Sequence, residues 1–61
     1  MSKFEIIEKV GISKQSYSEA VKDALKEIDK EISWFEVVEQ RGRLTPDGEI
    51  EFQVIIKIGC N

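Results

Sequence analysis

The clearest pattern in the sequence is an alternation of apolar and polar residues near the end of the chain. From Glu49 to Ile58 every second residue is a large apolar one, and this period of two predicts a β-strand with one buried face. The opposite series of the same segment contains the amide of Gln53 and the side chain of Ile55. We expect the core to be centred on three residues of the apolar series: Phe52, Val54 and Ile56.

Two further segments have the composition of strands. Phe4–Val10 is rich in apolar and β-branched residues and predicts the first strand, followed by a turn over Gly11–Gln15. Trp34–Leu44 predicts the second strand. The residues Thr45–Gly48, with the sequence TPDG, form a strong turn signal because proline presets φ and glycine accepts a positive φ. The last two strands are therefore expected to form a hairpin.

An amphipathic helix is predicted between the first and second strands. The residues Ser16–Glu19 fit a capping box, which marks the start of a helix. Beyond it, apolar residues recur at spacings of three and four along one side, and charged residues occupy the other side. This apolar stripe consists of Tyr17, Ala20, Val21, Ala24, Leu25, Ile28 and Ile32. The helix is expected to cover one face of a sheet.

The predicted order is β-α-β-β, an α+β fold with a three-stranded antiparallel sheet and one helix. A right-handed crossover through the helix leaves space for the third strand between the first and the second. One helix covers only one face of three strands, so the opposite face, which carries Gln53, Ile55 and one series of the Trp34 strand, stays open. An uncovered face with a tryptophan, aliphatic residues and an amide predicts an interface.

The length of the chain supports the same conclusion. With 61 residues, the sequence has room for one domain, residues 1–61, and for a thin core. Proteins of this size usually add disulfides, a structural metal or further copies of themselves. Cys60 is the only cysteine and histidine is absent, which excludes a disulfide within the chain and a zinc site of Cys and His ligands. Self-association remains, and we expect Cys60, beside the chain end, to be dispensable.

Charge and hydropathy exclude some partners. Nine Lys and Arg residues are scattered among twelve Asp and Glu, for a net charge of −3. Nucleic-acid binding needs a concentrated basic patch, so nucleic acid is not an expected partner. The sequence has no apolar stretch long enough for a signal peptide or a membrane span. We therefore expect a cytoplasmic protein without membrane contact.

Several segments together resemble the dodecin family over nearly the whole chain. They are Val10–Ser13, the helix alanines Ala20 and Ala24, the sequence WFEVVEQRGR over Trp34–Arg43, FQV over Phe52–Val54, and KIG over Lys57–Gly59. The tryptophan followed by FEVVE and RGR, with an aromatic residue and a glutamine in the next strand, is a specific combination. The chain is therefore similar to a family of small flavin-binding proteins.

The resemblance implies a hollow homododecamer with flavin, either riboflavin or FMN, stacked in pairs at pockets between subunits. Trp34 matches the tryptophan that stacks on the isoalloxazine ring, and such stacking on indole is favourable. Gln53 matches the glutamine that hydrogen-bonds the polar ring edge, where an amide supplies both donor and acceptor. Arg43 matches a basic position near the ligand, which suits the phosphate of FMN, and Glu39 matches an acidic one.

Each of these residues also has a purely structural interpretation. Trp34 is then a core residue, Gln53 an exposed strand residue, and Glu39 a solvated or ion-paired glutamate. Strict alternation places Arg43 and Trp34 on opposite faces of their strand. One pocket receives both only through a bulge, for example at Gly42, or from two different copies.

The sequence is consistent with a binding protein, an enzyme or a structural shell to different degrees. A flavin-binding protein that stores and buffers flavin needs no catalytic group and is the preferred interpretation. We expect no enzymatic activity, because without histidine and with one near-terminal cysteine only carboxylates and Lys57 remain as acids, bases or nucleophiles. The alternative is a structural shell of the same fold that binds another small ligand or calcium, although the acidic residues near Asp47 lack the spacing of an EF-hand loop.

Overall fold

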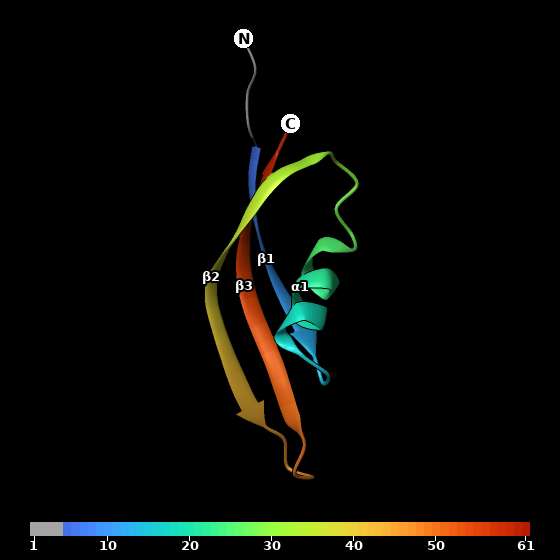
Figure 1. The fold of residues 1–61 in the computed structure, drawn as a ribbon, viewed down its shortest axis with the longest axis vertical. Helices are drawn as coiled ribbons and strands as arrows, with labels where there is room; N and C mark the ends of the chain where they lie inside the picture. Colours follow the sequence, from blue (N-terminus) through green and yellow to red (C-terminus); the bar gives the residue numbers. More distant parts are fainter. Residues whose placement is uncertain (1–4) are drawn as a thin grey trace.

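A computed structural model describes residues 5–61, so Phe4, which the sequence pattern assigns to the first strand, lies outside the described residues. The elements are β1 (Glu5–Ser13), α1 (Tyr17–Leu25), β2 (Ile32–Leu44) and β3 (Ile50–Cys60). The strands form one antiparallel sheet in the order β1-β3-β2, with α1 against one face (Figure 1). Over residues 5–61 no helix combines the length and apolar character of a membrane span. The predicted β-α-β-β fold with a central third strand is confirmed.

β1 continues three residues beyond its predicted end, and Gly11 lies within the strand instead of in a turn. A Cβ atom at this position would overlap the backbone oxygen of Ala20 and lie 2.9 Å from Cβ of Ala24. Both alanines are buried on the inner side of α1. Glycine is needed at this point because the helix crosses β1 at very short range, and any side chain would push the two elements apart.

α1 begins where the sequence predicts and ends earlier. The side chain of Ser16 caps the helix by accepting a hydrogen bond from the backbone N–H of Glu19 at 3.0 Å. After Leu25 the chain leaves the helix through a turn, in which the N–H of Ile28 donates to the carbonyl of Leu25 at 3.1 Å. Ile32 already belongs to β2, so the prediction of a helix reaching this residue is wrong. Ile28 and Ile32 still pack against the core, but from a loop and a strand.

The core is a narrow row of residues between α1 and β3. Its fully buried members are Ala20, Ala24, Val54, Ile56, Ile58 and Cys60. Phe52 is partly buried and meets the ring of Tyr17 edge-on, with ring centroids 4.9 Å apart. The expected core centre is thus confirmed for Val54 and Ile56. Cys60 has no exposed surface, which the sequence did not indicate, and the expectation that it is dispensable for assembly stays a prediction.

β2 lies at one edge of the sheet and contains no buried residue. α1 packs on β1 and β3 and leaves β2 largely uncovered (Figure 1). The large apolar residues that β2 exposes are Trp34, Phe35, Val37, Val38 and Leu44. The radius of gyration is 13.1 Å, whereas a compact chain of this length has about 10.5 Å. A single copy is therefore an extended protomer that leaves much of its apolar surface exposed.

Candidate functional site

The sheet face turned away from α1, called the open face below, carries all four residues that the sequence singles out. Residues paired directly across strands point to the same face, so the register defines its members. Trp34 is paired with Gly59 there, and Arg43 is paired with Glu51. β1 adds three exposed aliphatic residues to this face: Ile6, Val10 and Ile12. β2 and β3 place Glu39 and Gln53 on it as well.

A bulge in β2 brings Trp34 and Arg43 to the same face. The register shifts at Val38, which is the extra residue between two regularly paired stretches. An extra residue inverts the alternation beyond it, so the even-numbered Trp34 and the odd-numbered Arg43 point the same way. The assumption of strict alternation was therefore wrong. A bulge was one of the two routes considered, but it lies at Val38, and pairing at Gly42 is regular.

The indole of Trp34 lies against the backbone of Gly59. A Cβ atom at position 59 would overlap two atoms of the indole, Cε2 and Nε1, and would lie 2.7 Å from Cζ2. The tryptophan nevertheless keeps 40% of its surface exposed. A flat aromatic side chain that rests on bare backbone and is open to solvent can stack a second planar ring. A glycine inside a strand signals such close approach, and this signal at Gly59 was available in the sequence.

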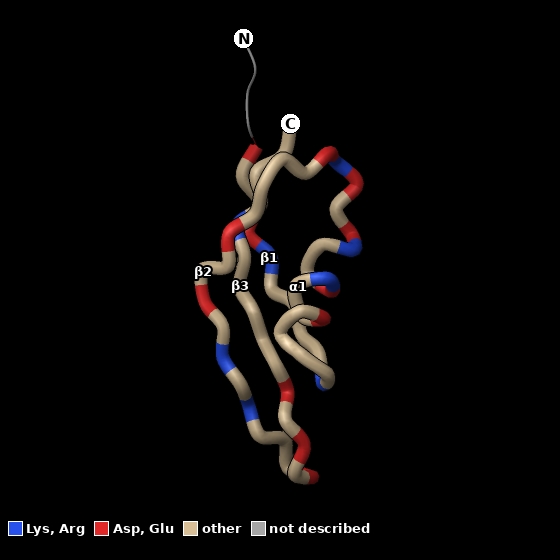
Figure 2. The backbone as a smooth tube through the Cα atoms, viewed as in Figure 1, with Lys and Arg blue, Asp and Glu red and all other residues tan. Residues whose placement is uncertain are grey.

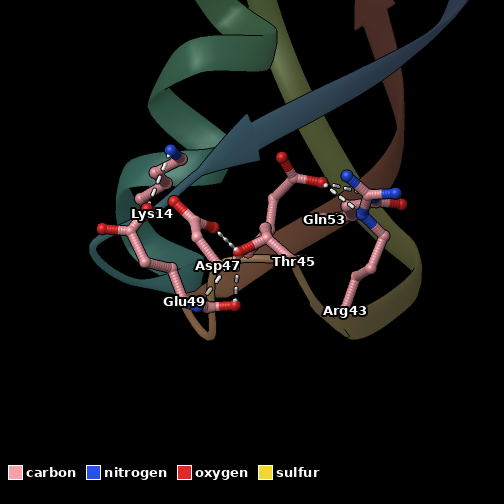
Figure 3. Close-up of polar contacts among 7 residues, drawn as sticks. Lys14, Arg43, Thr45, Asp47, Glu49 and Gln53 are labelled. Atoms are coloured by element: carbon pink, nitrogen blue, oxygen red, sulfur yellow. Dashed lines mark hydrogen bonds and ion pairs between the residues drawn. The ribbon is translucent and has the colours of Figure 1, made fainter.

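Gln53 and Arg43 share one carboxylate group further along the open face. Nε2 of Gln53 donates to Oε1 of Glu51 at 3.0 Å, and Nε of Arg43 donates to the same oxygen at 3.1 Å. Figure 3 shows Arg43 and Gln53 next to each other, with dashed lines to this carboxylate. The side chain of Glu51 is only 16% exposed. Sequence reasoning found the amide and the guanidinium but missed the glutamate that connects them.

Glu39 lies opposite Ile55 on the open face and forms an ion pair with Arg41 at 3.1 Å. Both charged groups are about half exposed, and such pairs contribute only about 0–1 kcal/mol to stability. Figure 2 shows the basic part of β2 running beside the acidic beginning of β3. The ion pair is weak, so it does not prevent Glu39 from contacting a ligand. The participation of Glu39 in a binding site stays a prediction.

Trp34 and Gln53 do not meet within one chain. Gly59, which supports the indole, is six positions from Gln53 on β3, and this corresponds to about 20 Å along a strand. One ring system cannot contact both side chains of the same copy. Residues 5–61 also enclose no pocket and bring together no set of acidic or cysteine side chains suited to a metal ion. A pocket that uses both residues must combine different copies.

The fold and the open face are those of a small-ligand-binding protomer of the β-α-β-β class. The family model described as Dodecin matches residues 4–61, which is almost the entire sequence. The chain belongs to the dodecin family.

Solved structures of dodecins are similar to the chain over nearly its whole length. An arginine-to-alanine mutant of Thermus thermophilus dodecin is 32% identical, with a TM-score of 0.79 and coverage of 95% of this chain and 90% of that one. Dodecin from Streptomyces davaonensis is 27% identical, with a TM-score of 0.79 and coverage of 95% and 90%. The calcium-chelating antigen calcium dodecin from Mycobacterium tuberculosis shares the fold, at 22% identity, a TM-score of 0.82 and coverage of 95% and 87%. No curated protein matches the chain.

Proposed function

We propose that the chain stores and buffers flavin, riboflavin or FMN, as a homododecamer that holds each flavin between copies and has no enzymatic activity. The observation that carries this proposal is the indole of Trp34, supported by Gly59 and exposed on a sheet face that the chain leaves uncovered. Exposed apolar surface of this kind marks interaction sites. Membership of the dodecin family supports a small planar ligand for this surface.

The side chains of the open face fit a flavin when they are contributed by neighbouring copies. Trp34 offers a stacking platform for the isoalloxazine ring. The amide of Gln53 offers the donor and acceptor that a pyrimidine edge requires. Arg43 uses Nε for Glu51, and its terminal nitrogens suit the phosphate of FMN. Glu39 provides carboxylate oxygens that can accept a hydrogen bond from the ligand.

The exposure of β2 supports an assembly larger than a dimer. On the open face the chain exposes Trp34, and on the opposite side of β2 it exposes Phe35 and Val37 beside α1. A neighbour that covers one of these faces leaves the other one uncovered. Two different contact surfaces on each copy allow rotations of different order to combine in one closed particle. A shell of twelve copies meets this requirement.

The proposal is tested by native mass spectrometry of the purified protein and by titration of riboflavin and FMN with it. We expect the mass of twelve chains and a saturable loss of flavin emission. A monodisperse monomer contradicts the assembly, and unchanged emission at high protein concentration contradicts flavin binding. Calcium binding measured by calorimetry, together with unchanged flavin emission, would favour the alternative of a calcium-binding shell.

A further inference from the structure

We infer that Glu51 is a positioning residue: it fixes the amide of Gln53 in one orientation and so selects ligands that present an N–H donor beside a carbonyl. This role rests on the flavin site proposed above and specifies which edge of the ligand that site accepts. It assigns a function to a residue that acts through Gln53.

The orientation of the Gln53 amide follows from its contact with Glu51. A carboxylate group only accepts hydrogen bonds, whereas an amide has a donating nitrogen and an accepting oxygen. Nε2 of Gln53 donates to Oε1 of Glu51 at 3.0 Å, and the reverse orientation would bring two acceptor oxygens together. Among residues 5–61, no group donates a hydrogen bond to Oε1 of Gln53. This oxygen and the second N–H of Nε2 are therefore available to a ligand.

The carboxylate itself is held in place from the neighbouring strand. Arg43 of β2 is paired with Glu51 in the sheet register and donates its Nε–H to Oε1 at 3.1 Å. The low exposure of the Glu51 side chain, 16%, leaves it little freedom to turn toward solvent. The positioning therefore involves both strands. The guanidinium of Arg43 fixes the carboxylate of Glu51, and this carboxylate fixes the amide of Gln53.

The fixed amide offers an acceptor and a donor side by side. A matching ligand edge carries an N–H next to a carbonyl oxygen, which is the arrangement at N3 and its adjacent carbonyls in a flavin. A ligand without this N–H leaves Oε1 of Gln53 without a partner, and unpaired polar groups at a buried contact weaken binding. The expected selectivity is therefore for N3–H flavins over N3-alkylated ones.

The test compares riboflavin with 3-methylriboflavin, in which a methyl group replaces the N3 proton, by fluorescence titration of the assembled protein. The unchanged protein is expected to prefer riboflavin by about tenfold or more. In Glu51→Leu no carboxylate oxygen accepts a hydrogen bond from Nε2, so Gln53 can adopt both orientations. Riboflavin then binds more weakly while 3-methylriboflavin is little affected, and the preference falls to about threefold or less.

Glu49→Leu is the matched control, because it removes an equal charge from an exposed ion pair with Lys14 at 2.9 Å. This variant is expected to keep the full preference for riboflavin. Glu51→Asp is the second test variant: it keeps the charge but shortens the reach to Gln53, and it is expected to lose the preference as Glu51→Leu does. Native mass spectrometry confirms that each variant is assembled.

A merely structural role of Glu51 predicts a different result, in which both ligands lose affinity by the same factor and the preference stays unchanged. That result, or unchanged affinities in both Glu51 variants, overturns the positioning role and leaves the proposed function intact. If the unchanged protein quenches neither ligand, the proposed function and the positioning role are both overturned.

Discussion

The place of Trp34 depends on the absence of a side chain at residue 59. The indole occupies the space that a Cβ atom of Gly59 would take, and the strand pairing aligns the two residues. The stacking surface is therefore a property of two residues on neighbouring strands. Each of them can be changed separately, and the two changes give different tests.

Replacement of Trp34 by alanine removes the proposed stacking platform. Aromatic stacking contributes on the order of 1–3 kcal/mol per contact, so the affinity for riboflavin should fall by about fivefold to a hundredfold. Fluorescence titration measures the affinity, and native mass spectrometry measures the assembly. Trp34→Phe keeps a smaller ring and should bind with intermediate affinity. If Trp34→Ala dissociates the particle while the separated copies still quench flavin, Trp34 is a packing residue.

Replacement of Gly59 by alanine keeps the tryptophan but displaces its ring. The added methyl group overlaps the indole, so the ring has to leave its present position, and flavin affinity should fall about as far as in Trp34→Ala. Gly42→Ala is the control, since its Cβ atom would lie 3.7 Å from Oη of Tyr17, an ordinary contact. Equal flavin affinity in the two glycine variants, measured by the same titration, would contradict the pairing of indole and glycine.

At the scale of the elements, Asp23 joins α1 to the end of β1. Its Oδ2 accepts a hydrogen bond from the backbone N–H of Ile12 at 3.0 Å, and its Oδ1 pairs with Nζ of Lys26 at 2.8 Å. These contacts hold the pKa of Asp23 below its usual range, and the contact with Lys26 has a larger effect than the contact with Ile12. The carboxylate therefore stabilises the contact between helix and strand only while it is charged.

The lowered pKa of Asp23 predicts a specific dependence of stability on pH. The contribution is complete above the ordinary aspartate pKa of about 3.9 and is lost as the pH falls through the lowered value of the folded state. Asp23→Asn lacks this contribution at every pH. The difference in melting temperature between the two proteins should be constant from pH 7 to pH 5 and should narrow below about pH 4. A difference that does not change with pH would show that the carboxylate charge is irrelevant.

The elements also show where prediction from the sequence succeeds. The alternation in β3 and the cap at Ser16 are local signals, and both determine structure locally: the alternating segment forms a strand and the helix begins at its cap. The end of α1 is different, because Ile28 and Ile32 keep the helical spacing and reach the same core from other elements. The spacing of apolar residues therefore indicates which side chains face the core. It does not identify the secondary structure to which those residues belong.

The bulge at Val38 could not be located from the sequence for a related reason. No glycine or proline marks it, and the glycine that was available, Gly42, pairs regularly. Whether the alternation of β2 side chains between the two faces inverts depends on the pairing of β2 with β3, which is a tertiary property. The candidate residues Trp34 and Arg43 were therefore found from their chemistry, while their common face became visible only in the sheet.

For the whole molecule, the thin core makes each buried residue important, and Cys60 is one of them. Cys60→Ser places a hydroxyl group where the thiol is fully buried, and a buried polar group without a partner costs about 1–3 kcal/mol in each copy. We expect a particle of unchanged mass that melts at a lower temperature, as measured by differential scanning calorimetry. Cys60→Ala, which adds no polar group, should be affected less. Equal melting of Cys60→Ser and the unchanged protein would show that the thiol does not contribute to packing.

Because Trp34 lies on the open face, its fluorescence can be used to detect binding at that face. The chain has one tryptophan and one tyrosine, and they lie on opposite sides of the sheet. Tyr17, the first residue of α1, contacts Phe52 of β3, so its absorption responds to the packing of the helix on the sheet. The indole emission responds instead to whatever approaches the open face. Because indole absorbs at longer wavelengths than phenol, selective excitation of the single tryptophan reports on the occupation of the open face without any attached dye.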